Sequence, residues 1–223
     1  MSVLLLGDYF NGLADIEPIL NQSYSLEVIC FLDTTQYPDL SLPTQWSVID
    51  FHDFHQLTIE IIEIDPRVIV YISPYLRKAR CELYPDLADM ANAEAIEHLR
   101  EIVTMNNCHL IVISSNHLGG SDIRTQTLTE GEDAVRGMGK VTILRIPEIA
   151  DHSAEGIVAY VNQHNTKNSL ATLDYQVLAG ELKSIINHHR YGIIELPGNN
   201  NIPELDALPK FSGNPADFED SNN

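Results

Sequence analysis

Short runs of aliphatic residues alternate along the chain with longer segments in which apolar residues recur at helical spacing. Continuous apolar runs of this length are typical of strands that are buried on both faces of a parallel sheet. Helical segments between such runs form βαβ units, so the pattern predicts an α/β domain with a mostly parallel sheet. The expected strands cover residues 3–6, 26–32, 46–49, 68–72, 110–113, 141–144 and 193–196.

The segments between these strands predict helices near residues 14–20, 57–64, 86–105, 129–138 and 174–188, with a further helix through Ile157 and Tyr160. Asp65-Pro66 ends the second of them, because proline cannot continue a helix. We expect residues 77–80 to form a basic loop. After residue 198 the chain is rich in Asn, Pro and acidic residues, which is typical of an extended arm. The predicted organisation is therefore one domain over residues 1–198 and an acidic tail over 199–223.

The charge balance and the cysteine content limit which partners we expect and in which cellular compartment. The formal net charge is -19, from 32 acidic and 13 basic residues. This balance argues against nucleic acid and against an anionic membrane surface, and no apolar run reaches the ~20 residues that span a bilayer. The start of the chain lacks the basic leading segment of a signal peptide. The scattered Cys30, Cys81 and Cys108 fit reduced thiols, so we expect a cytoplasmic protein with a core that includes Cys30 and Cys108.

Several short strings in chain order carry a family resemblance. They are residues 65–70 (DPRVIV), 92–94 (NAE), 110–115 (LIVISS) with the turn 116–120, 131–132 (GE), 142–145 (TILR) and the closing segment 172–198. Their order and spacing resemble the extended short-chain dehydrogenases/reductases, particularly the branch of dTDP-4-dehydrorhamnose reductases and NAD-dependent epimerases. The resemblance implies a Rossmann-like three-layer domain, and the short chain implies a reduced substrate-binding portion.

The resemblance also indicates where a dinucleotide would bind. The family places three glycines in a Gly-x-x-Gly-x-x-Gly turn after the first strand, so that the backbone approaches the pyrophosphate at a helix N-terminus. Here Gly7 keeps the first position, Phe10 and Leu13 take the other two, and Gly12 is out of register. A Phe10 side chain in that turn is expected to occupy the space of the dinucleotide.

Three further positions match the family's cofactor and catalytic residues. Asp33 ends the second strand, where dinucleotide-binding domains place an acid on the ribose hydroxyls, although an ordinary strand-end carboxylate explains it equally well. Asp50 resembles the residue that flanks adenine. Ser115 matches the catalytic Ser or Thr. We therefore treat Gly7, Gly12, Asp33, Asp50 and Ser115 as a vestigial cofactor site for NAD or NADP.

The family's catalytic pair is a Tyr with a Lys four residues later, in which the Lys lowers the pKa of the phenol. Counting back from Gly131 places Arg124 at the Tyr position and Leu128 at the Lys position. None of the nine tyrosines has a Lys four residues on. The expected function is therefore a non-catalytic scaffold or adaptor without cofactor, which acts through protein partners in a complex. The alternatives are an NAD(P)-dependent oxidoreductase or epimerase with a reorganised site that uses Ser115, and a nucleotide-binding sensor.

Two groups of residues are candidates for contacts with a protein partner. The basic residues Arg77, Lys78 and Arg80 could receive an acidic segment, and a solvated loop is the other reading. The tail carries apolar residues that could dock on another subunit or fold back on their own domain, namely Ile202, Leu205, Leu208 and Phe211.

The sequence gives little support for a metal site or for a hydrolase active site. His52 and His55 are three residues apart, a spacing that could hold a metal, but no third ligand is identifiable and Asp53 reads as a helix cap. We therefore expect no metal site. The chain has no Gly-x-Ser-x-Gly elbow, Walker loop or Cys-x-x-Cys pair.

Overall fold

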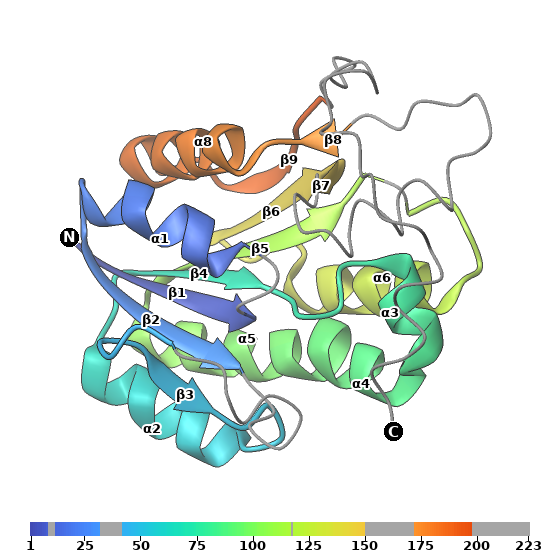
Figure 1. Cartoon of the computed structure of the whole chain (residues 1–223), viewed down its shortest axis with the longest axis horizontal. Coiled ribbons are helices and arrows are strands. Elements are labelled where there is room, and N and C mark those ends of the chain that lie inside the picture. The colour runs from blue at the N-terminus through green and yellow to red at the C-terminus, as the bar shows by residue number, and fades with distance from the viewer. Residues whose placement is uncertain (9–11, 32–41, 117, 150–171, 198–223) are drawn as a thin grey trace, which may run out of the picture.

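A computed structural model of the chain describes residues 1–8, 12–31, 42–116, 118–149 and 172–197. Seven strands form one sheet in the order β3-β2-β1-β4-β5-β6-β9, and every neighbouring pair is parallel (Figure 1). A separate parallel pair joins β7 (Glu148–Ile149) to β8 (Thr172–Leu173). The seven strands are β1 (Ser2–Asp8), β2 (Ser25–Phe31), β3 (Ser47–Ile49), β4 (Val68–Ile72), β5 (His109–Ser115), β6 (Val141–Ile146) and β9 (Gly192–Glu195).

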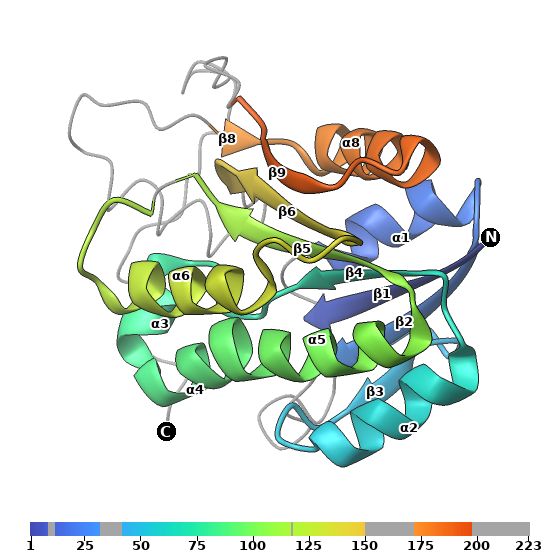
Figure 2. The same cartoon turned by 180° about the vertical axis from the view of Figure 1, so that it is seen from behind.

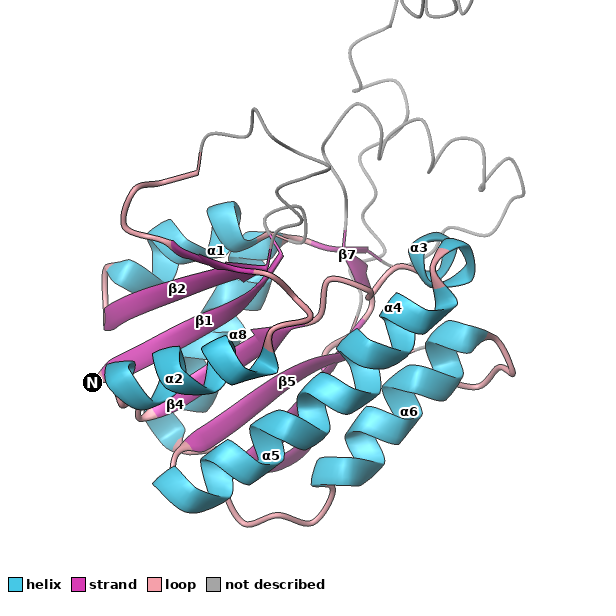
Figure 3. Ribbon diagram, turned by 90° about the horizontal axis from the view of Figure 1, so that it is seen from below, coloured by secondary structure: helices cyan, strands magenta, loops and turns pink. Residues whose placement is uncertain are grey.

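Helices cover both faces of this sheet and produce three layers. One face is covered by α1 (Leu13–Asn21) and α8 (Tyr175–His188), which lie together above the strands in Figure 1. The other face is covered by α2 (Phe54–Ile64), α5 (Ala95–Asn106) and α6 (Ile123–Val135), which Figure 2 shows from behind. Figure 3 shows α5 and α6 packed side by side.

The core has two halves because successive side chains of a strand point to opposite faces of the sheet. In β1, Val3 and Leu5 belong to the half under α1 and α8, whereas Leu4 and Leu6 belong to the half under α2 and α5. All four side chains are fully buried. The central strands are therefore apolar on both faces, which explains their uninterrupted aliphatic runs.

The strand order places a topological switch point between β1 and β4. From β1 the chain moves outward to β2 and β3, and it then returns to the other side of β1 to form β4. In open α/β sheets the crevice at the carboxyl ends of the strands at such a point is where ligands bind. This edge therefore holds the candidate site.

The structure confirms the α/β fold and the seven expected strands, and it corrects two local predictions. Lys78 and Arg80 do not lie on a loop: they belong to α3 (Lys78–Leu83), for which Arg77 is the N-cap. The helix expected at 129–138 begins at Ile123 and ends at Val135, because the Asp122 side chain accepts a hydrogen bond from the Thr125 backbone N–H and starts the helix early.

The helix expected at 86–105 is a continuous helical run with an irregular middle. It consists of α4 (Pro85–Asp89), a π-helical segment (Met90–Glu94) and α5. The predicted Asp53 cap of α2 is confirmed, since its carboxylate accepts from the Gln56 N–H at 2.8 Å. The predicted helix through Ile157 and Tyr160 and the tail 199–223 lie outside the described residues. Within the described ranges, no helix is long and apolar enough to cross a membrane.

Candidate functional site

The two glycines near the end of β1 hold the elements of the crevice close together. A Cβ atom on Gly7 would lie 2.7 Å from the carbonyl oxygen of Ile72, so a side chain here would push β1 away from β4. Gly12 has φ of 89° and is the N-cap of α1. A Cβ atom there would lie 1.9 Å from the Tyr175 ring, which comes from the first turn of α8. Packing against Ile72 and Tyr175 is thus sufficient to require glycine at both positions.

Beside Gly7, the last residue of β1 forms an ion pair that sequence reasoning missed. The Asp8 carboxylate is 3% exposed, and its Oδ2 accepts from Arg80 Nη1 at 2.8 Å. The Arg80 guanidinium in turn lies 4.8 Å from the centre of the Tyr75 ring, where burial raises the pKa of the phenol. An acid directly after Gly7 at a strand end was the available sequence signal, but its partner is 72 residues away.

At the end of β5, Ser115 lies beside the residue that takes the family's Tyr position in the sequence. Arg124 Nη2 donates to Ser115 Oγ at 2.6 Å, and both side chains are buried. Arg124 is the second residue of α6, so the Asp122 cap that starts this helix also sets the position of the guanidinium. One turn later, Leu128 is 1% exposed and belongs to the core half under α1 and α8.

A buried amide joins the loop between β4 and α3 to α6. Asn92, in the π-helical segment, donates to the Tyr75 carbonyl oxygen and to Thr127 Oγ1, both at 3.0 Å, and its Oδ1 accepts from Ser73 Oγ. Gly131 allows α6 to approach, since a Cβ atom there would lie 1.9 Å from the Asn92 carbonyl oxygen. These contacts fix where α6 presents its first turn.

A second buried carboxylate explains two of the strings that carry the family resemblance. Glu132 accepts from Arg145 Nη2 at 2.6 Å and from Arg145 Nε at 3.0 Å, and also from Ser114 Oγ at 2.7 Å. Glu132 is 1% exposed, so the bidentate pair replaces water around the carboxylate. The Gly-Glu string and the strand that contains Arg145 therefore serve to join α6 to β6.

Of the other predicted cofactor residues, Asp50 follows β3 at the carboxyl edge of the sheet and is exposed. Hydrogen bonds from the backbone N–H and the ring of His52 lower its pKa. Asp33 and Phe10 lie outside the described residues, so the expectation that Phe10 fills the dinucleotide space stays a prediction. The tail residues Ile202, Leu205, Leu208 and Phe211 also lie outside them.

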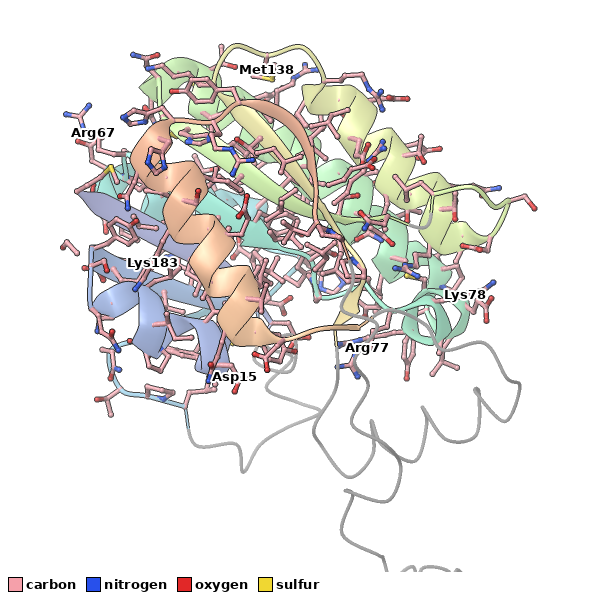
Figure 4. All side chains as sticks on the ribbon, turned by 90° about the horizontal axis from the view of Figure 1, so that it is seen from above. Asp15, Arg67, Arg77, Lys78, Met138 and Lys183 are labelled. Atoms are coloured by element: carbon pink, nitrogen blue, oxygen red, sulfur yellow. The ribbon has the colours of Figure 1, made fainter. Side chains whose placement is uncertain are left out.

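The basic candidates for partner binding lie at the same end of the molecule, where Figure 4 labels Arg77 and Lys78. Lys78 Nζ is 3.2 Å from Asp122 Oδ2 and 3.7 Å from Glu82 Oε1, and Arg80 is held by Asp8. Much of their charge is therefore balanced within the chain. In the part of the chain that the structure describes, no cluster of three or more His, Cys, Asp or Glu side chains could hold a metal ion.

Comparison with known proteins identifies the fold. A scan against models of protein families and a search of curated protein sequences give no match. A solved structure described as a hypothetical dTDP-4-dehydrorhamnose reductase from Sulfolobus tokodaii matches with a TM-score of 0.71 and 19% identity, over 89% of this chain and 77% of that one. The dTDP-4-dehydrorhamnose reductase from Bacillus anthracis in complex with NADP matches with a TM-score of 0.68 and 15% identity, over 89% and 75%.

L-threonine dehydrogenase from Phytophthora infestans matches with a TM-score of 0.68 and 13% identity, over 88% of this chain and 76% of that one. These identities are low, so what the three proteins share with this chain is the arrangement of strands and helices. The chain has the Rossmann-like α/β fold of dTDP-4-dehydrorhamnose reductases and of related dehydrogenases.

Proposed function

We propose that this protein binds a nucleotide, of the NAD(P) type, at the carboxyl edge of its sheet, and that it acts as a sensor without transferring hydride. The observation that carries the proposal is the switch point between β1 and β4, where α1 follows β1 with Gly12 as its N-cap. A helix N-terminus at such a crevice attracts phosphate groups. The similarity to a reductase that was solved with NADP supports this proposal over an adaptor role without a ligand.

The residues beside Ser115 argue against proton transfer by the family's catalytic pair. Such a step needs a group that can give up and regain a proton near neutral pH. Arg124 cannot take this role, because a guanidinium in a protein has donors only and does not act as an acid or base. Leu128 has no proton to exchange and is packed in the core. Ser115 Oγ accepts its described hydrogen bond from Arg124, a group that cannot take a proton from it.

The residues around α1 fit a nucleotide in part. Gly7 and Gly12 lie where the phosphates would bind, although Ile72 and Tyr175 already fill the space that a side chain at these positions would take. The cofactor would supply a redox-active nicotinamide ring. Asp15, an acid in the first turn of α1, opposes an anion there, as does any charge that Asp8 keeps in its pair with Arg80. We therefore expect weak binding, with a dissociation constant well above that of an enzyme with three phosphate glycines.

One observation favours the adaptor as a second candidate. The Tyr175 ring occupies the space beside Gly12, so that glycine is explained by packing without any ligand. A domain that kept its core and used its surface for a protein partner would also tolerate Arg124 and Leu128.

Titration of the full chain with NADH and with NADPH separates the two candidates, with cofactor fluorescence and melting temperature as readouts. We expect saturable binding and a rise in melting temperature, since a ligand at 100 times its dissociation constant stabilises by about 2.7 kcal/mol. We expect no oxidation of the cofactor. Failure of millimolar NADH and NADPH to shift the melting temperature would leave the adaptor as the better account.

A charge variant tests whether the titrated cofactor binds at the N-terminus of α1. Asp15→Asn removes the acid from the first turn of α1 and is expected to tighten binding several-fold, because like charge near phosphate is relieved. Asp133→Asn is the matched control, since Asp133 is an exposed acid on α6. Equal effects of both variants would indicate only the change in net charge.

A further inference from the structure

A tyrosine of α8 lies at the end of α1 where the phosphates of a nucleotide would bind. The two helices pack side by side, and both begin at the carboxyl edge of the sheet (Figure 1). Tyr175 is the first residue of α8, and Gly12 is the N-cap of α1. The packing of the two helices therefore brings the Tyr175 side chain to the N-terminus of α1.

The Tyr175 ring fills the space beside this N-cap. A Cβ atom on Gly12 would lie 1.9 Å from Cε1 of the ring and 2.5 Å from both Cδ1 and Cζ. One whole side of the ring, and not only its tip, thus stands against the glycine. A helix presents the backbone N–H groups of its first turn at its N-terminus, and a bound phosphate must come close to them. A phosphate group that approached α1 past Gly12 would therefore meet the ring.

The backbone of Tyr175 is fixed, whereas its ring can turn. The Asp174 carboxylate caps α8 by accepting from the Gln176 N–H at 2.6 Å. Leu178 and Leu182 of the next turns are fully buried in the core half that α8 shares with α1. The ring packs against this core half but is only partly buried. Rotation about its side-chain bonds can thus carry the ring towards solvent without moving α8.

We propose that Tyr175 makes an autoinhibitory contact: its ring covers the phosphate-binding end of α1 and must turn away before a nucleotide binds. The proposal rests on the nucleotide-binding function above and specifies how that site is regulated. The covered state is favoured without ligand, because turning the ring out returns apolar surface to water. A site that is open for only a fraction of the time binds with an affinity reduced by that fraction.

Removal of the ring tests the contact directly. Tyr175→Ala is expected to bind NADH at least tenfold more tightly than the wild type, in a fluorescence titration of the full chain below the melting temperature of the variant. Val177→Ala is the matched control, since Val177 belongs to the same turn of α8 and is 45% exposed; we expect it to bind as the wild type does. A similar gain in both variants would overturn the proposal.

Two other substitutions separate the ring from the stability of α8. Tyr175→Phe keeps the ring, so it is expected to bind NADH several-fold more weakly than Tyr175→Ala. If Tyr175→Ala does not fold, Tyr175→Leu keeps an apolar side chain but lacks Cε1 and Cζ, and it is expected to bind several-fold more tightly than the wild type. Equal affinities of Tyr175→Phe and Tyr175→Ala, or wild-type affinity in Tyr175→Leu, would contradict a role of the ring.

A matched pair of ligands locates the gain at the phosphates. ADP differs from adenosine only by its two phosphate groups, and calorimetric titration measures the binding of both. We expect Tyr175→Ala to gain affinity for ADP and not for adenosine. An equal gain for the two ligands would show that the ring does not act at the phosphate end, and it would overturn the proposal.

The outcomes for NADH distinguish this proposal from the nucleotide-binding function. Equal affinities of the wild type and Tyr175→Ala would remove the autoinhibition and leave nucleotide binding in place. Binding by Tyr175→Ala alone would support the autoinhibition and show that the wild-type chain is closed. Failure of the folded variant to bind either NADH or ADP at millimolar concentration would overturn both proposals.

Discussion

The ring of Tyr175 lies against Gly12, so close that a Cβ atom on the glycine would stand 1.9 Å from Tyr175 Cε1. This contact joins the first turn of α8 to the start of α1, although the two residues are 163 positions apart in the sequence. Gly12 also needs its φ of 89°, which a residue with a side chain adopts only at a cost. Both the contact with the Tyr175 ring and the positive φ therefore require glycine at position 12.

Gly12→Ala should destabilise the protein through both the clash with the Tyr175 ring and the strain of a positive φ. Gly137→Ala isolates the strain. Gly137 has φ of 81°, and a Cβ atom at this position would meet nothing within 4 Å beyond its chain neighbours. Its substitution therefore measures backbone strain alone, about 1–2 kcal/mol. We expect a larger loss for Gly12→Ala in urea unfolding. In a Tyr175→Ala background the excess should largely disappear, and an excess that persists without the ring would contradict the packing role of Tyr175.

The buried Glu132 should be among the carboxylates on which stability depends most. Glu132→Gln replaces the buried partner of Arg145 by a neutral amide and leaves it only the exposed Glu195 carboxylate among its described ion pairs, and breaking a buried pair in this way costs about 3–5 kcal/mol. Asp133→Asn, the neighbouring exposed acid that pairs with Arg136, should cost less than about 1 kcal/mol. Comparable unfolding free energies for the two variants would show that the Glu132 pair does not join α6 to β6 in the way its geometry indicates.

His109 predicts a pH dependence of stability at the other end of β5. Thr142 Oγ1 donates its proton to the Arg190 carbonyl oxygen, so the imidazole must donate from Nε2 to Thr142 Oγ1 at 2.7 Å. Its Nδ1 is buried and has no hydrogen-bond partner among the described residues. Desolvation, with smaller contributions from His189 and Lys140, lowers the pKa of His109 to about 4.

The sign of the pH effect follows from this lowered pKa. Between pH 6.5 and about 4 the unfolded chain binds a proton that the folded chain does not, so the contribution of His109 is complete above pH 6.5 and falls as the pH drops. The loss should reach roughly 2–3 kcal/mol. His109→Gln should show a flatter pH dependence of unfolding than the wild type, and the exposed His55→Gln should not. Parallel curves for the wild type and His109→Gln would refute the assignment.

Leu128 tests whether the family's Lys position belongs to the core in this chain. Leu128→Lys would place an ammonium group among apolar neighbours and should cost several kcal/mol, whereas Leu128→Met should cost less than about 1.5 kcal/mol. The measurement is the free energy of unfolding by urea. A lysine that is tolerated within a few tenths of a kcal/mol would mean that this position opens into the crevice.

The sheet can be predicted from the sequence because its central strands are apolar on both faces. The predicted bounds of Val68–Ile72 match the structure to the residue, since no polar position interrupts the run and Pro66 separates it from the preceding helix. The start of α6 at Ile123 is not predicted, because its buried residues are not all apolar. Its first turns carry Arg124, Thr125 and Thr127, which are buried but polar, and hydrophobic periodicity does not detect buried polar residues.

The candidate site is predictable only in part. The neighbourhood of Ser115 and Arg124 follows from the family resemblance, because both residues occupy positions that the family brings together. The pairs Asp8–Arg80 and Glu132–Arg145 do not follow from it, because each joins distant elements and depends on which way the chain packs. The contact of Tyr175 with Gly12 cannot be predicted either, because the local sequence does not show which helices are neighbours.

Hydrogen exchange in the presence of a cofactor tests nucleotide binding most directly, because it locates the ligand as well as detecting it. With saturating NADH or NADPH, we predict added protection of the backbone amides at the end of β1 and in the first turn of α1, at Asp8, Leu13 and Ala14. Amides at the opposite end of the sheet, such as that of Val68, should not change. Protection that is absent from the β1–α1 junction, or that appears only elsewhere, would contradict nucleotide binding at the switch point.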